Sequence, residues 1–246
     1  TLVTNDHRER APLAADRDMF LDDEDAVIEG LSRYSHLASG VPGTVAGLLE
    51  VLERYGSLPR SQVMAPAIQL AEEGFALNYD LVRQFQRRRE AFAEHPPTLA
   101  KFSRLDGEPY EVGDVFRQPY LAATLRRIAE EGRAGFYEGR TADLIVEEMR
   151  RGGGIISHRD LAEYHSVWRE PITGTYRGYQ VVSMPPPSSG GVLLVQMLNM
   201  LEAYPVARMG YGSADAVHLM VEAERRAYAD RAEHLGDTDF YDVPIE

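Results

Sequence analysis

The stretch that decides the fold is WREPITGTYRGYQVVSMPPPSSGG, residues 168–191. β-Branched and aromatic residues dominate its first part, and isolated glycines interrupt them. This pattern predicts two strands joined by a short turn within residues 168–184. The three consecutive prolines that follow favour a rigid, extended loop over residues 185–191, in which Ser188 or Ser189 can cap the next helix.

Helical patterns dominate the rest of the chain. Apolar residues at helical spacing predict helices near residues 45–55, 61–73, 79–93, 121–131, 142–151, 192–202 and 213–234. Asn78 is the expected cap of the third helix, and Ser213 or Asp215 that of the last. Pro96 and Pro97 are expected to end the third helix. We therefore predict part of an α/β domain, mainly helical, whose few strands are too few to complete a sheet and pair with strands outside this chain.

The composition limits the partners and the chemistry. The chain has 246 residues with 26 basic and 39 acidic side chains, a net charge of −13. Nucleic acids and anionic membranes need a positive field, so neither is an expected partner, whereas a small anionic substrate needs only local positive charge. The chain has no cysteine, which excludes disulfides, thiolate metal sites and a cysteine nucleophile.

Residues with catalytic or metal-binding chemistry are poorly grouped in the sequence. His218 and Glu222 lie four residues apart on a predicted helix, but two ligands from one helix do not make a metal site, and a surface pair is the favoured interpretation. No serine lies in a convincing nucleophile motif, and Ser189 and Ser213 are better interpreted as helix caps. The residues alone therefore predict no catalytic group and no metal.

One short segment, residues 6–12, could recognise a carboxylate. Arg8 lies between Asp6 and Glu9 and shortly before Pro12. A guanidinium group can hold a carboxylate through two parallel, charge-assisted hydrogen bonds, which a lysine cannot reproduce. A buried arginine of this kind would suit a substrate carboxylate. The alternative, an ordinary ion pair with Asp6 or Glu9, is favoured by these residues alone.

Four groups of motifs nevertheless resemble the gamma-glutamyltranspeptidase family. They occur in the family's order and span nearly the whole chain, in residues 8–12 with 17–22, 39–47 with 54–56 and 65–67, 176–179 with 184–191, and 227–231 with 235–237. The resemblance implies a four-layer αββα sandwich of the N-terminal-nucleophile type. It implies that residues 1–246 form a single incomplete domain, the large-subunit part of a precursor that cuts itself. The nucleophile would then be the N-terminal threonine of an absent small subunit, and not Thr1.

The resemblance also implies an activity. The threonine would attack the gamma-carbonyl of glutathione or another gamma-glutamyl donor, and water, an amino acid or a dipeptide would accept the glutamyl group. No metal or cofactor is required, the location would be periplasmic or secreted, and this segment alone would be inactive. Arg8 matches the family's arginine for the α-carboxylate of the glutamyl group, whereas the loop 185–191 would be structural. A cephalosporin or glutaryl acylase of the same fold, or a non-catalytic binding homologue, stays open.

Overall fold

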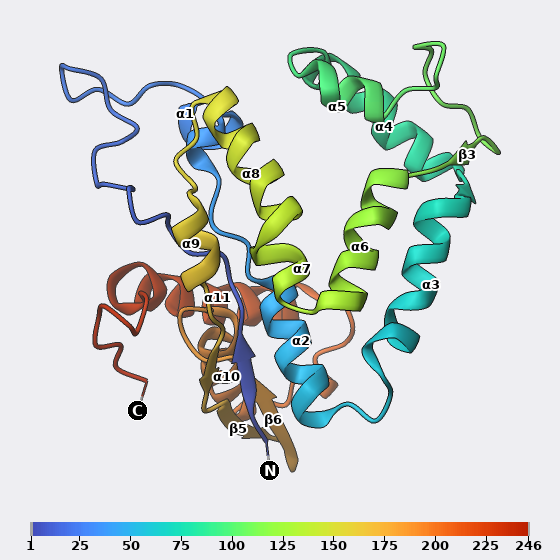
Figure 1. The fold of residues 1–246 in the computed structure, drawn as a ribbon. Coiled ribbons are helices and arrows are strands. Elements are labelled where there is room, and N and C mark those ends of the chain that lie inside the picture. The colour runs from blue at the N-terminus through green and yellow to red at the C-terminus, as the bar shows by residue number, and fades with distance from the viewer. Residues whose placement is uncertain (1, 246) are drawn as a thin grey trace. The chain divides into compact units, whose positions relative to one another are not determined.

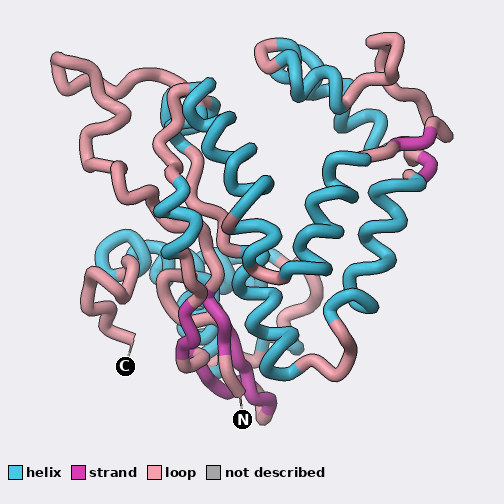
Figure 2. Tube along the Cα trace, viewed as in Figure 1, coloured by secondary structure: helices cyan, strands magenta, loops and turns pink. Residues whose placement is uncertain are grey.

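The computed structural model describes residues 2–245, which form two compact units. Unit 1 contains the chain up to Asp6 and from Val167 onward, and unit 2 is His7–Ser166. Helices make up most of the regular structure, with short strands between them (Figures 1 and 2), so the predicted mainly helical α/β content is confirmed. The single incomplete domain expected for residues 1–246 stays a prediction, because only the complete protein can show whether the two units share one domain.

Unit 1 contains two antiparallel strand pairs. β1 (Thr4–Asp6) pairs with β4 (Val167–Arg169), and β5 (Ile172–Tyr176) forms a hairpin with β6 (Tyr179–Ser183). Arg177 and Gly178 form the hairpin turn at φ values of 49° and 84°, and positive φ at both positions matches the twist of the flanking strands. The predicted hairpin is thus confirmed. The start of the predicted region belongs instead to a third strand, whose partner lies far away in the sequence.

One helix covers this hairpin, and a second helix packs on the first. α10 (Gly190–Glu202) packs on β5 and β6, and α11 (Ala214–His234) packs on α10, with the 3-10 turn η2 (Val206–Arg208) between them. Ser213 caps α11 by accepting a hydrogen bond from the Ala216 N–H at 3.2 Å, as predicted. Ser189 makes no capping hydrogen bond, because its hydroxyl accepts from the Arg231 Nε at 3.1 Å.

Unit 2 is a helical assembly with one short strand pair. Its elements are α1 (Leu31–Tyr34), η1 (His36–Ala38), α2 (Thr44–Tyr55), α3 (Arg60–Glu73), β2 (Phe75–Ala76), α4 (Tyr79–Ala93), α5 (Pro96–Lys101), β3 (Val115–Phe116), α6 (Pro119–Glu131), α7 (Ala134–Tyr137), α8 (Gly139–Gly152) and α9 (His158–Glu163). Asn78 caps α4 as predicted, accepting from the Leu81 N–H at 2.9 Å. Pro96 and Pro97 were expected only to end a helix, but they begin α5, because a proline in the first turn sacrifices no hydrogen bond.

Two buried clusters hold unit 2 together. The first consists of Val41, Ala46, Tyr137, Ala142, Val146, Ile156, Leu161 and Tyr164. The second lies around Leu77, Val82 and Phe116, under the ends of α3 and α4. The first cluster matters for function, because it brings the chain around residue 41 together with α7, α8 and α9.

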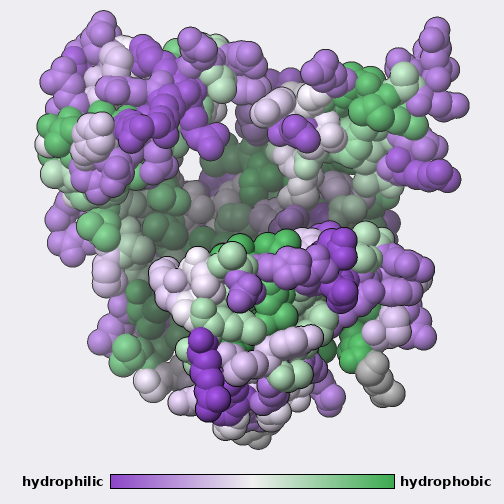
Figure 3. Space-filling model, turned by 180° about the vertical axis from the view of Figure 1, so that it is seen from behind, coloured by the Kyte–Doolittle hydropathy of each residue, from purple (hydrophilic) through white to green (hydrophobic). Residues whose placement is uncertain are grey.

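Apolar side chains also remain at the surface. Figure 3 shows hydrophobic residues exposed among hydrophilic ones on the face that it presents. On α11, for example, Val217, Met220 and Val221 are each about half exposed. Among residues 2–245, no helix combines the length and the apolar character needed to cross a membrane.

Candidate functional site around Arg8

The segment that carries Arg8 is held against a glycine-containing turn of unit 2. We call residues 7–10 the arginine segment and residues 40–47 the glycine turn. Arg10 donates its backbone N–H to the Val41 carbonyl at 3.1 Å and accepts from the Val41 N–H at 2.7 Å. This isolated antiparallel bridge fixes one end of the arginine segment on the glycine turn.

Three glycines allow the close approach of the two segments. A Cβ at Gly40 would lie 2.8 Å from the Glu9 Cγ, and one at Gly47 would lie 2.6 Å from the His7 Nδ1. A Cβ at Gly43 would meet the His7 carbonyl oxygen more closely still. Ordinary van der Waals contact begins at about 3.4 Å. The absence of side chains at these three glycines is therefore what lets the arginine segment lie where it does.

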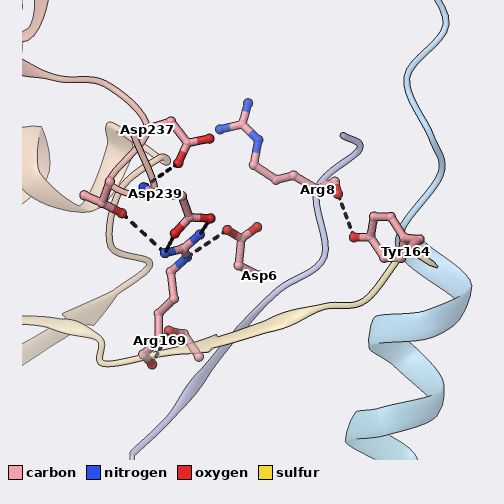
Figure 4. A network of polar contacts seen from close by, with 8 residues as sticks. Asp6, Arg8, Tyr164, Arg169, Asp237 and Asp239 are labelled. Atoms are coloured by element: carbon pink, nitrogen blue, oxygen red, sulfur yellow. Dashed lines mark hydrogen bonds and ion pairs between the residues drawn. The ribbon is translucent and has the colours of Figure 1, made fainter. Parts of the chain in front are cut away.

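Tyr164 fixes the backbone of Arg8 directly. Its hydroxyl donates to the Arg8 carbonyl at 2.7 Å (Figure 4). The Tyr164 side chain is buried and stacks on Tyr137, with ring centres 5.9 Å apart and planes 6° from parallel. The Tyr137 hydroxyl donates to the Pro42 carbonyl at 2.8 Å and accepts from the Ala46 N–H at 3.2 Å. Burial raises the pKa of Tyr137. From inside the core, Tyr164 thus holds the arginine segment, and Tyr137 holds the glycine turn.

Charged groups support this tyrosine stack. The Arg133 guanidinium lies 4.4 Å from the centre of the Tyr137 ring and donates to the backbone carbonyls of Ala162 and Tyr164, at 3.0 Å and 2.5 Å. Asp160 is buried and accepts from the Leu13 N–H at 2.6 Å. Burial raises the pKa of Asp160, but this hydrogen bond and those from Ser157 outweigh burial, so the pKa falls below its usual value. These contacts tie the end of α9 to the chain that follows Arg8.

The side chain of Arg8 itself is exposed. In Figure 4 it runs away from Tyr164, on the opposite side of the backbone from the carbonyl that Tyr164 holds. The carboxylate-binding role considered from the sequence was that of a buried arginine, and the structure differs because the buried Tyr164 binds the Arg8 carbonyl and not its side chain. The result is an exposed arginine on a backbone that Tyr164 fixes.

In unit 1, an ion-pair network holds the strand that leads into the arginine segment. Arg169 donates to Asp6 at 2.9 Å and makes a two-pronged pair with Asp239, at 2.9 Å for each bond (Figure 4). The side chains of Arg169 and Asp6 are 13% and 7% exposed, so this pair is well shielded from water. Hydrogen bonds to Asp239 raise the pKa of Arg169 despite its burial. Asp6, one of the two acids considered as a partner for Arg8, is thus engaged by Arg169.

The family model described as Gamma-glutamyltranspeptidase matches residues 1–246. The chain belongs to the gamma-glutamyltranspeptidase family. It is 50% identical to the glutathione hydrolase proenzyme of Escherichia coli (strain K12) over 240 residues, which is 97% of this chain and 41% of that protein. The chain therefore spans about two fifths of the length of the curated relatives that it matches.

Solved structures agree with this family membership. The chain superposes on the crystal structure of Helicobacter pylori gamma-glutamyltranspeptidase with a TM-score of 0.96 and 44% identity, covering 99% of this chain and 70% of that one. This likeness confirms the predicted fold class. The chain is also 42% identical over 208 residues to the acylase ACY 1 proenzyme of Pseudomonas sp. (strain SE83), covering 85% of this chain and 37% of that protein.

Other candidate groups in this chain do not assemble into a site. Glu222 accepts from Arg226 at 2.7 Å and from Arg225 at 2.9 Å, rather than sharing a ligand with His218. In the part of the chain that the structure describes, no three His, Asp or Glu side chains are grouped so that they could hold a metal ion. Thr1, which the sequence analysis set aside as a nucleophile, lies outside the described residues.

Arg8 was predicted from the sequence as a substrate-binding residue and stays a prediction, whereas the residues that hold its backbone were not predicted. Tyr164 lies 156 positions from Arg8, and no local pattern links the two. One signal was available, because Gly47 lies inside a predicted helix. A glycine there weakens the helix and often marks a close approach of another backbone.

Proposed function

We propose that this chain is the large-subunit part of an enzyme that transfers or hydrolyses gamma-glutamyl groups. The match of the family model to all 246 residues carries this proposal. The donor would be glutathione or a related gamma-glutamyl compound, and the acceptor water, an amino acid or a dipeptide. In the complete protein, residues 1–246 would form one incomplete domain in a periplasmic or secreted enzyme.

The nucleophile in this proposal is the N-terminal threonine of a small subunit. The curated relatives are named as proenzymes and are more than twice as long as this chain, which supports a second part made from the same precursor. The exposed apolar side chains of α11 also support it, because such surface is typical of a face that another subunit covers. The threonine hydroxyl would attack the gamma-carbonyl while its own α-amine accepts the proton.

The role proposed for this chain is to bind and orient the donor through Arg8. Its guanidinium would hold the α-carboxylate of the glutamyl group in a two-pronged, charge-assisted pair. An exposed ion pair contributes at most about 1 kcal/mol. When a bound donor and the small subunit exclude water from the site, the same pair becomes stronger because the local dielectric falls. The exposed guanidinium on a fixed backbone suits such a binding role.

Arg8→Lys in the complete, processed protein tests this role. We expect kcat/KM for gamma-glutamyl-p-nitroanilide to fall at least about 30-fold, since breaking a buried, hydrogen-bonded charge pair costs about 2–5 kcal/mol. Arg159→Lys is the matched control, because Arg159 forms an exposed ion pair with Glu163 on α9. We expect this control to stay within about twofold of wild type. An unchanged KM and kcat/KM for Arg8→Lys would refute the assignment.

A cephalosporin or glutaryl acylase is the second candidate function. The 42% identity to the acylase ACY 1 proenzyme favours keeping it. Comparing the complete protein on gamma-glutamyl-p-nitroanilide and on a glutaryl-acylated substrate separates the two activities. Reading the residues downstream of Glu246 tests the non-catalytic alternative, because a homologue without a threonine at the processing point cannot form the acyl-enzyme.

A further inference from the structure

We propose that Tyr164 is a positioning residue for Arg8, and that its hydroxyl sets how the guanidinium meets the donor's α-carboxylate. The inference rests on the proposed role of Arg8 and adds a residue that makes no contact with the donor. Tyr164 acts on the backbone carbonyl of Arg8, from the side opposite to the Arg8 side chain (Figure 4).

The geometry makes Tyr164 a rigid support. Its side chain is 3% exposed, its ring stacks on Tyr137, and its backbone carbonyl accepts from Arg133 at 2.5 Å. A tyrosine held in this way has little freedom to move its hydroxyl. Because the Tyr164 ring is fixed in the core, its hydrogen bond of 2.7 Å also fixes the position of the Arg8 backbone.

The fixed points of the arginine segment lie on both sides of Arg8. His7 lies against Gly43 and Gly47 before it, and Arg10 forms the bridge with Val41 after it. Between these points, the Tyr164 hydroxyl fixes the carbonyl of Arg8 itself. Removing this hydroxyl would free the peptide plane after Arg8 to rotate, and the long side chain amplifies such a rotation at the guanidinium. A misplacement of about 1 Å at a binding group can cost a large factor in rate.

Tyr164→Phe is the discriminating variant, because it removes the hydroxyl and keeps the stacked ring. In the complete protein, we expect KM for gamma-glutamyl-p-nitroanilide to rise about 3- to 10-fold, which corresponds to the loss of one hydrogen bond, while kcat changes less than about twofold. The same variant should leave kcat/KM unchanged for 4-aminobutyryl-p-nitroanilide, a donor that lacks the α-carboxylate. A purely structural role for Tyr164 would change both donors by one factor.

Tyr137→Phe is the matched control, since the Tyr137 hydroxyl bonds to Pro42 and Ala46 instead of Arg8. We expect it to change both donors by the same factor. A second measurement combines Tyr164→Phe with Arg8→Lys. If Tyr164 acts through Arg8, kcat/KM of the double variant should equal that of Arg8→Lys alone within about twofold, because coupled residues are not additive.

Three outcomes overturn the inference: an equal effect of Tyr164→Phe on both donors, no change in KM for the gamma-glutamyl donor, or multiplication of the two single effects in the double variant. Failure of the proposed function is a different result. In that case the wild-type protein is inactive on gamma-glutamyl-p-nitroanilide, or Arg8→Lys leaves it unaffected, and the positioning role falls with it.

Discussion

Gly43→Ala tests whether the arginine segment and the glycine turn approach as closely as the structure shows. The added Cβ would lie 2.5 Å from the Tyr164 Cζ, and closer still to the Tyr164 hydroxyl and the His7 carbonyl. Gly43 has a φ of −110° and a ψ of −19°, which an alanine can adopt, so the substitution causes no backbone strain of its own. The destabilisation should therefore come from the steric overlap and not from the backbone conformation.

The magnitude follows from three contributions. Forcing an extra methyl group into a packed site costs about 1–3 kcal/mol. Displacing the Tyr164 hydroxyl from the Arg8 carbonyl costs about 1 kcal/mol more. The lower entropy of alanine in the unfolded chain offsets about 0.4–1 kcal/mol. We therefore expect the free energy of unfolding to fall by about 1–3 kcal/mol, measured by urea titration of the complete protein with circular dichroism.

Gly190→Ala provides the control for this substitution. Gly190 begins α10, and the nearest atom to its added Cβ would be the Ser188 Oγ at 3.9 Å. We expect the control to keep the free energy of unfolding or to raise it slightly, by at most about 1 kcal/mol. If Gly43→Ala leaves the midpoint at the wild-type value, the close approach described here is wrong.

Substitutions at three further positions test other parts of the fold. Hydrogen bonds from Arg151 lower the pKa of Glu148 to about 2 from a usual 4.5. The ionised Glu148 carboxylate therefore stabilises the fold above pH 4.5, and this stabilisation is lost as the pH falls toward 2. The stability difference between wild type and Glu148→Gln in acid titrations should therefore be constant above this window and shrink within it; a difference independent of pH would contradict the pairing. Asn78→Ala removes the α4 cap and should lower the free energy of unfolding in urea titrations by about 1 kcal/mol. Asn78→Asp keeps an acceptor oxygen at the cap and should retain most of the wild-type free energy of unfolding. Arg169→Gln removes the guanidinium from the shielded Asp6 carboxylate and should cost about 3–5 kcal/mol in the same titrations, and a loss below about 1 kcal/mol would show that the pair is exposed in solution.

The longer helices could be predicted because their ends are encoded locally, whereas the short helices α1, α5, α7 and α9 were not predicted. Gly74 follows α3 at a φ of 80°, a value that favours glycine, and Asn78 and Ser213 place an acceptor at the first turns of α4 and α11. These signals act over three or four residues, so the sequence displays them directly. α5 escaped prediction because a proline pair can equally end one helix or begin the next.

The candidate site could be predicted only in part. Arg8 was predicted because its neighbours match a family motif, whereas the bond from Tyr164 and the pairing of β1 with β4 join residues more than 150 positions apart. A tyrosine before a strand has many possible partners, and only the folded chain selects one. The partners of Arg169 could not be predicted either, because an arginine in the sequence is as compatible with solvent as with an ion pair to Asp6 and Asp239.

The pairing of β1 with β4 has a consequence for the order of assembly during synthesis. The bond between Asp6 and Arg169 spans 163 positions, and closing a loop of that length in an unfolded chain costs on the order of 4–5 kcal/mol. All of unit 2 leaves the ribosome before β4 does. As unit 2 folds, the bond from Tyr164 to Arg8 brings its two ends together, so most of this entropy is already lost when Val167 emerges. Until β4 has been synthesised, β1 has no partner strand. Folding of unit 2 then brings β4 next to β1.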